Sequence, residues 1–225
     1  MNLLALDTAT EACSVAARIN GRWAQRFVDL GRGHTDALMP MIHEVMEELG
    51  AGFGDLERLA VGRGPGAFTG VRIGVACAQG LAQGLGVPVA PVSNLAAMAW
   101  VAAAERGDGL VAVAIDARAG GVYFGGFDTA AGRLPEPVIA ERVCPPEQVP
   151  LIDRPRILTA GTGWTRHPEV LAEAVGCPTV DSGVRLPSAR AIAELALLGA
   201  PTVAAADVEP VYLRDQVVHA PKAKA

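Results

Sequence analysis

The fold is decided by the stretch from Leu3 to Leu30, which reads LLALDTATEACSVAARINGRWAQRFVDL. Two apolar runs flank the pair Asn20-Gly21 in this stretch, and Asn-Gly between such runs is a strong signal for a tight β-hairpin. A meander of strands needs helices to cover it, so the following sequence should supply them. We expect three antiparallel strands, at 3–7, 13–19 and 23–30.

The first covering helix is predicted over residues 35–49, with Thr35 or Asp36 as its N-cap, Pro40 near its start and Gly50 just past its end. Apolar residues recur in it at spacings of three and four, which is the pattern of one helix face. Met39 and Met46 widen the apolar sector, so we expect this helix to contact two partners. The residues of the main stripe are Leu38, Met41, Ile42, Val45 and Leu49.

A glycine-rich stretch, Gly-Arg-Gly-Pro-Gly-Ala-Phe-Thr-Gly at 62–70, separates a predicted strand at 59–61 from a predicted helix over 71–85. Glycines at the N-terminus of a helix can bring backbone amides close to a phosphate. The stretch has no lysine for GxxxxGK(S/T), and Thr69 stands where GxGxxG needs its third glycine. The helix also has small residues at intervals of four. A tight turn with close helix packing is therefore favoured, and an anion site stays open as the alternative.

The second half of the chain partly repeats the first. A strand at 111–115 ends in Asp116, as the strand at 3–7 ends in Asp7, and a glycine turn then leads to a strand at 122–127. This internal repeat predicts a duplicated α/β fold of two lobes, with residues 1–106 in the first and 107–225 in the second. The remaining elements are predicted as strands at 87–92, 157–160 and 210–214, helices at 94–105 (capped by Ser93), 169–175 and 188–199, and a proline-rich irregular or edge-strand connection at 132–155.

Common catalytic and metal-binding motifs are absent from this sequence. The histidines include no HxxxH or HExxH pair for a metal, and no serine lies in a GxSxG turn. Asp7 and Asp116 end equivalent strands, where an ATP-using protein of duplicated halves would hold carboxylates near Mg²⁺. The turns after them lack the glycine that a phosphate-gripping turn needs, so both are weak candidates for a cofactor site. We predict no cofactor, no metal and no catalytic residue.

Composition favours a cytoplasmic protein that does not bind nucleic acid unaided. The net charge is −5, and the only two lysines are Lys222 and Lys224, so no basic face for phosphates is evident. No apolar run approaches the ~18 residues of a membrane span, and the N-terminus has no basic leader. The four cysteines form no CxxC pair, which indicates reduced thiols.

Four motifs occur in a characteristic order and spacing: Leu6-Asp7-Thr8-Ala9-Thr10, His34 with Leu38-Met39-Pro40, the segment from Gly62 to Gly74, and Ile115-Asp116-Ala117-Arg118 with Val122-Tyr123. Together they closely resemble the TsaB family, also called YeaZ. The match covers about the first 125 residues and extends weakly to Tyr212-Leu213-Arg214. The resemblance implies a fold of the actin, sugar kinase and Hsp70 type. It also implies a role in threonylcarbamoylation of adenosine 37 of tRNA.

The resemblance further implies partners. In that family TsaB is a non-catalytic scaffold that pairs through its two N-terminal helices with TsaD, the enzyme that transfers the threonylcarbamoyl group, and the ATPase TsaE joins the assembly. A homodimer through the same helices is expected without TsaD, and tRNA is reached only through the complex. The apolar residues of both helices are the predicted partner surface, although the sequence leaves open which side faces outward. They are Leu38, Met41, Ile42, Val45, Gly74, Val75, Ala78 and Gln79.

Two rival functions stay open. An ATP-dependent kinase or acyltransferase of the same fold class would use Asp7 and Asp116, and tight binding of ATP to the isolated chain would support it. A peptidase would need a nucleophile or metal motif, which the sequence lacks.

Overall fold

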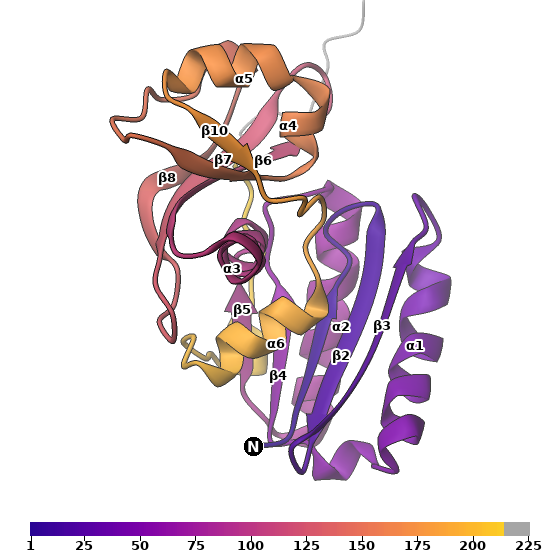
Figure 1. The fold of residues 1–225 in the computed structure, drawn as a ribbon. Coiled ribbons are helices and arrows are strands. Elements are labelled where there is room, and N and C mark those ends of the chain that lie inside the picture. The colour runs from indigo at the N-terminus through magenta and orange to yellow at the C-terminus, as the bar shows by residue number, and fades with distance from the viewer. Residues whose placement is uncertain (214–225) are drawn as a thin grey trace, which may run out of the picture.

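Two five-stranded sheets form the centres of two lobes in the computed structural model, which describes residues 1–213 of the 225-residue chain (Figure 1). The strand order is β3-β2-β1-β4-β5 in the first sheet and β8-β7-β6-β9-β10 in the second. In both, a three-stranded antiparallel meander is extended by two parallel strands. The repeated topology confirms the duplicated α/β fold of the actin, sugar kinase and Hsp70 type.

The strands follow one another in the same order in both lobes, but only the first lobe has an α-helix between its third and fourth strands. The first lobe has β1 (Leu3–Asp7), β2 (Ala12–Ile19), β3 (Arg22–Asp29), α1 (His34–Leu49), β4 (Arg58–Gly62), α2 (Phe68–Leu85), β5 (Val89–Val92) and then α3 (Asn94–Arg106). The second has β6 (Gly109–Asp116), β7 (Val122–Thr129), β8 (Glu136–Cys144), β9 (Ile157–Ala160), α4 (Thr162–Arg166), α5 (Pro168–Val175), β10 (Thr179–Asp181) and then α6 (Ala189–Leu197).

Each sheet is covered by helices on both faces, because its central strands are apolar on both sides. Successive side chains of a strand point to opposite faces. On β1, Leu4 and Leu6 lie in the cluster with α1 and α2, whereas Leu3 and Ala5 lie in the cluster with α6. In the second lobe one face of β6 packs against α4 and α5, and the other packs against α3.

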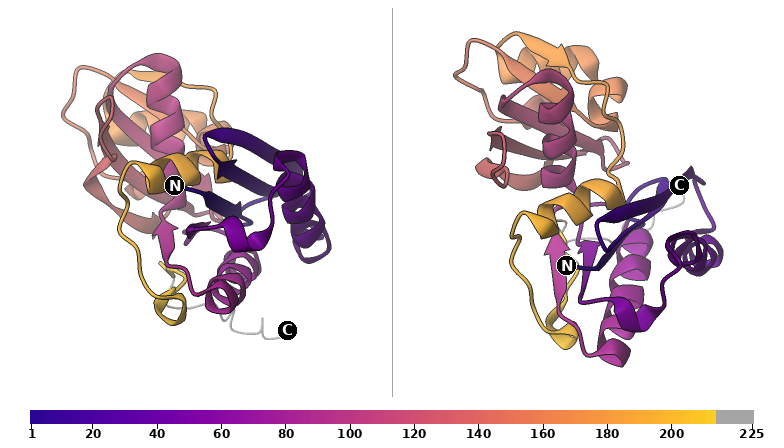
Figure 2. Two further views of the ribbon diagram at one scale, coloured as in Figure 1. Left: turned by 90° about the horizontal axis from the view of Figure 1, so that it is seen from below. Right: turned by 60° about the horizontal axis from the view of Figure 1, so that its bottom comes forward.

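The last helix of each lobe packs on the sheet of the other lobe. Residues of α3, such as Leu95 and Met98, share a buried cluster with β6, β7 and β9, and α6 contacts β1, β2 and β4. Both views in Figure 2 show α6 against the indigo strands of the first lobe. After α6, Val203 forms a bridge with Val89 of β5, and Val208 is buried against α2. The predicted division into 1–106 and 107–225 is therefore wrong for these segments, since amphipathic helices reveal a buried face but not its partner.

Most predicted elements agree with the structure to within a few residues, and the differences lie at their ends. Ser93 caps α3 by accepting a hydrogen bond from the Ala96 amide, as predicted. The predicted cap of α1 is wrong, because the N-cap position is Gly33 in the left-handed conformation, and glycine has no side chain to cap the helix. The proline-rich connection contains the edge strand β8. Residues 210–213 form no strand, so this part of the prediction of a strand at 210–214 is wrong. Residue 214 lies outside the described residues, as do His219, Lys222 and Lys224.

No helix within residues 1–213 is both long enough and apolar enough to cross a membrane.

Candidate functional site

A cleft of about 710 Å³ lies between the two lobes. The turn after β1, the start of α1 and the start of α2 line it from the first lobe. The end of β6 and Tyr123 line it from the second, and residues 211–213 close one side. The cleft therefore joins the segments that carry the family motifs, and it is the first place to look for chemistry.

Asp7 does not face this cleft. Its side chain is fully buried, and its Oδ1 accepts hydrogen bonds from Asn94 Nδ2 at 2.7 Å and from the Ala9 amide at 3.3 Å. Its Oδ2 has no hydrogen-bond partner among residues 1–213. Burial raises the pKa of Asp7 to about 6, and the hydrogen bond from Asn94 offsets part of this rise. Asp7 therefore joins β1 to the start of α3 rather than presenting a carboxylate to a ligand.

The glycine-rich loop is filled by the chain's own backbone. A Cβ placed on Gly66 would lie 2.2 Å from the carbonyl oxygen of Ala9, so no side chain fits there. The Ala67 amide donates to that same oxygen at 2.7 Å, and the Thr8 hydroxyl donates to the carbonyl of Gly70 at 2.6 Å. These contacts agree with the predicted tight turn and close helix packing. They place α2 directly against the turn that follows β1.

Asp116 occupies the equivalent position in the second lobe but lines the cleft. Its Oδ1 accepts a hydrogen bond from the Arg118 amide at 3.0 Å, and its Oδ2 lies 3.4 Å from Arg166 Nε. Arg118 also reaches Glu11 of the first lobe, at 3.9 Å across the cleft. Of the two predicted cofactor candidates, only Asp116 is thus in the cleft, and it is engaged by arginine.

The histidines and cysteines of the described residues are dispersed. His34 is buried at the start of α1 with its Nε2 2.9 Å from the Thr10 carbonyl, and His43 is exposed with its ring edge-on to Phe53. Burial raises the pKa of Cys13 to about 11, which keeps that thiol protonated. Within the described part of the chain, no three side chains of His, Cys, Asp or Glu are grouped so that they could hold a metal ion.

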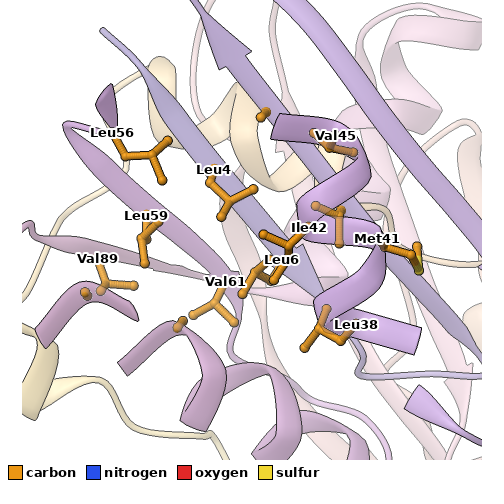
Figure 3. Close-up of a cluster of buried hydrophobic side chains, with 14 of the residues drawn as sticks. Leu4, Leu6, Leu38, Met41, Ile42, Val45, Leu56, Leu59, Val61 and Val89 are labelled. Atoms are coloured by element: carbon orange, nitrogen blue, oxygen red, sulfur yellow. The ribbon is translucent and has the colours of Figure 1, made fainter. Parts of the chain in front are cut away.

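The predicted partner residues of α1 are in the core. Leu38, Ile42 and Val45 are at most 2% exposed, and Met41 is 6% exposed. Figure 3 shows the four side chains in the buried cluster that also contains Leu4 and Leu6 of β1. The predicted side of the helix is therefore wrong, because the same periodicity marks a face packed on a sheet and a face packed on a partner.

The predicted residues of α2 are also turned inward. Gly74, Val75 and Ala78 are buried, and the half-buried Gln79 donates a hydrogen bond to the Val208 carbonyl at 2.8 Å. The outward surface of the two helices is a different set of residues, joined where Cys77 Sγ lies 3.9 Å from Met39 Sδ. We call this surface the α1–α2 face; its residues are Met39, His43, Ile73, Ala76, Cys77 and Gly80, each exposed or half-buried.

Sequence reasoning missed a set of polar residues that connects the loop before α2 with α3 and β8. The buried Asn94 accepts a hydrogen bond from the Gly64 amide at 2.8 Å and also binds Asp7. Arg63 pairs with Glu141 of the second lobe at 3.4 Å, and the Ser93 hydroxyl donates to the same carboxylate. The sequence offers no signal for Glu141, since it lies 78 residues from Arg63 in an edge strand.

The comparisons with known proteins agree with this architecture. A family model described as TsaD, tRNA N6-adenosine threonylcarbamoyltransferase, matches residues 29–211. Proteins named tRNA threonylcarbamoyladenosine biosynthesis protein TsaB are 40% identical in Escherichia coli and 39% identical in Haemophilus influenzae, each over 96% of this chain and 96% and 95% of their own lengths.

A solved structure titled YeaZ from Pseudomonas aeruginosa superposes with a TM-score of 0.84 at 39% identity, covering 94% of this chain and 99% of that one. A second Pseudomonas aeruginosa structure, titled as an uncharacterized protein with similarity to peptidase YEAZ, gives a TM-score of 0.86 at 39% identity. Matches of this identity and coverage extend over both lobes. The chain therefore belongs to the TsaB (YeaZ) family of tRNA threonylcarbamoyladenosine biosynthesis proteins, within the wider group that the TsaD model describes.

Proposed function

We propose that this chain is a non-catalytic subunit in the formation of threonylcarbamoyladenosine at position 37 of tRNA, and that its partner is TsaD. Its family membership supports the pathway. The observation that supports a non-catalytic role is the glycine-rich loop, where the Ala9 carbonyl occupies the space that a ligand would need beside Gly66. Asp7, the carboxylate expected beside such a ligand, is buried and accepts a hydrogen bond from Asn94.

The α1–α2 face is the proposed docking surface for TsaD. It exposes apolar and small side chains from two long helices, and apolar surface of this kind is common at interfaces. Ala76 and Gly80 leave room for a partner helix to approach closely, and Met39 is 38% exposed beside them. Methionine adapts its shape to different partners, which suits a surface used for TsaD and for a second copy.

The remaining partners follow from the same role. The isolated chain forms a homodimer through the α1–α2 face at high concentration, because a self-complementary patch can pair about a two-fold axis. TsaE joins the complex with TsaD, tRNA is contacted only within that complex, and the assembly works in the cytoplasm.

The test is size exclusion with light scattering on the purified chain mixed with TsaD from the same source. A one-to-one complex is expected, and Met39→Glu or Ala76→Glu should abolish it by placing a charge in the interface. The matched control is Ala104→Glu, the same substitution on the exposed side of α3, which should leave the complex intact. Separate elution of the wild-type proteins, with or without nucleotide, would overturn the proposal.

The rival, an ATP-dependent kinase or acyltransferase, has its own test. Calorimetric titration of the isolated chain with ATP and Mg²⁺ should give no saturable heat if Asp7 is structural. Tight binding that is lost on Asp116→Asn would favour the rival instead.

A further inference from the structure

The loop that starts α2 is held by four parts of the molecule. The Arg63 amide donates to Val92 of β5 at 2.9 Å, and its carbonyl accepts from the Val211 amide at 2.8 Å. Gly64 exchanges two hydrogen bonds with Asn94, at 2.8 and 3.0 Å. The fourth contact comes from the second lobe, where Glu141 binds the Arg63 guanidinium. Since α2 begins six residues after Gly62, these contacts help to position the α2 part of the α1–α2 face.

Glu141 reaches the first lobe because β8 is irregular at that point. Phe124 pairs with Arg142, and Gly126 pairs with Ile139, so β8 advances three residues while β7 advances two. Ala140 and Glu141 together face Gly125 at this bulge. An extra residue of this kind re-aims side chains. The bulge directs the Glu141 carboxylate away from its own sheet, toward Arg63 of the first lobe.

Glu141 is a part-buried, paired charge. Its side chain is 13% exposed, and that of Arg63 is 27% exposed. One carboxylate oxygen lies 3.4 Å from Arg63 Nη2, and the other accepts the hydrogen bond from Ser93, the cap of α3. Removing one partner from such a pair leaves a desolvated charge without compensation. The pair therefore ties β8, the start of α3 and the start of α2 together.

We propose that Glu141 is a positioning residue, through which the proline-rich edge strand of the second lobe sets the loop of Arg63 and hence the docking surface on α2. This inference rests on the proposed pairing with TsaD. It gives the segment 132–155 a role in partner recognition although that segment is remote from the α1–α2 face. The second lobe then stabilises the position of the interface.

Two measurements test this role. Hydrogen exchange of the isolated chain should show faster exchange at residues 62–72 in Glu141→Ala, and Glu141→Gln, which keeps hydrogen bonding, should restore part of the protection. Calorimetric titration with TsaD should show affinity weakened about fivefold by Glu141→Ala. The double variant with Arg63→Ala should bind no more weakly than Glu141→Ala alone, because Glu141→Ala has already removed the ion pair that the two residues share.

Glu136→Ala is the matched control, since Glu136 is an exposed carboxylate of the same strand. It should change neither exchange at 62–72 nor affinity. Unchanged exchange at 62–72 in Glu141→Ala would overturn the positioning role. If the wild-type chain fails to bind TsaD, the proposed function fails, while the exchange result still decides whether Glu141 holds the loop.

Discussion

The two lobes repeat one topology but end their first strands differently. In the first lobe Asp7 is fully buried and bonded to a neutral amide, whereas Asp116 of the second lobe lies in the cleft beside Arg166. The lobes also differ after their third strands, where the first has the long helix α1 and the second has only a short 3₁₀ turn before β9. The carboxylate at the end of β1 is thus buried and the first lobe has an additional long helix, whereas the carboxylate at the end of β6 faces the cleft.

The lobes are not independent, because α3 and α6 are exchanged between their sheets. Leu95 of α3 is fully buried against the second sheet, and Leu195 of α6 is 2% exposed against the first. Each sheet therefore depends on a helix from the other half of the chain. An exchange of this kind couples the two lobes, which agrees with the proposed role of the chain as a scaffold.

The largest expected effect is loss of a buried leucine from an exchanged helix. Leu195→Ala and Leu95→Ala should each lower the free energy of unfolding by about 2–5 kcal/mol, since each leaves a cavity. Native-state hydrogen exchange should locate the damage in β1, β2 and β4 for Leu195→Ala, and in β6, β7 and β9 for Leu95→Ala. Damage confined to the lobe that is nearer in sequence would contradict the exchange.

The next effect is a pH dependence carried by Asp7. Its pKa rises from 3.8 to about 6 in the folded chain, which corresponds to a cost on the order of 3 kcal/mol for the ionised form. Because the folded pKa is raised, the free energy of unfolding is highest below about pH 4, where Asp7 is protonated in both the folded and the unfolded chain. This contribution is lost as pH rises through 6. Asp7→Asn should therefore gain stability relative to wild type between pH 4.5 and 7.5, measured by urea denaturation.

The same substitution at Asp116, which lies in the cleft, is the control for Asp7→Asn. It should show no comparable gain across this pH range. A difference between wild type and Asp7→Asn that stays constant with pH would show that Asp7 is not buried as the structure has it.

A smaller effect is expected at the glycine that meets the turn after β1. Gly66→Ala puts a Cβ 2.2 Å from the Ala9 carbonyl oxygen, and the backbone shift should cost about 1–3 kcal/mol. Gly161 directly follows β9 in the second lobe, and a Cβ there would lie 2.0 Å from the Ala114 oxygen, so Gly161→Ala should also destabilise. Gly84→Ala, in open space on α2, should be neutral or stabilising by up to ~1 kcal/mol in thermal melts. Tolerance of Gly66→Ala would mean that the loop has room for a ligand.

The sequence predicted the longer strands and helices well because their signals are local, but it missed the short elements α4 and β10. Asn20-Gly21 gives the first hairpin, and the stripe of α1 gives a helix with the right length. It could not decide that Leu38 and Ile42 face β1, since a sheet and a partner helix select the same apolar spacing. Nor could it place Asn94 against Asp7, 87 residues earlier, because a single buried hydrogen bond leaves no periodic pattern.

The smallest expected effect separates the two aspartates by their response to salt. Arg166 is 68% exposed where it pairs with Asp116, and exposed ion pairs contribute about 0–1 kcal/mol that salt screens. Arg166→Ala should therefore lower the free energy of unfolding by less than about 1 kcal/mol at low salt and by almost nothing at 1 M NaCl. Asn94→Ala should cost about 1–3 kcal/mol at both salt concentrations, because it leaves buried groups unpaired where ions do not reach. A salt-sensitive Asn94→Ala would mean that solvent enters the end of β1, and the contrast between the buried end of β1 and the exposed end of β6 would then be lost.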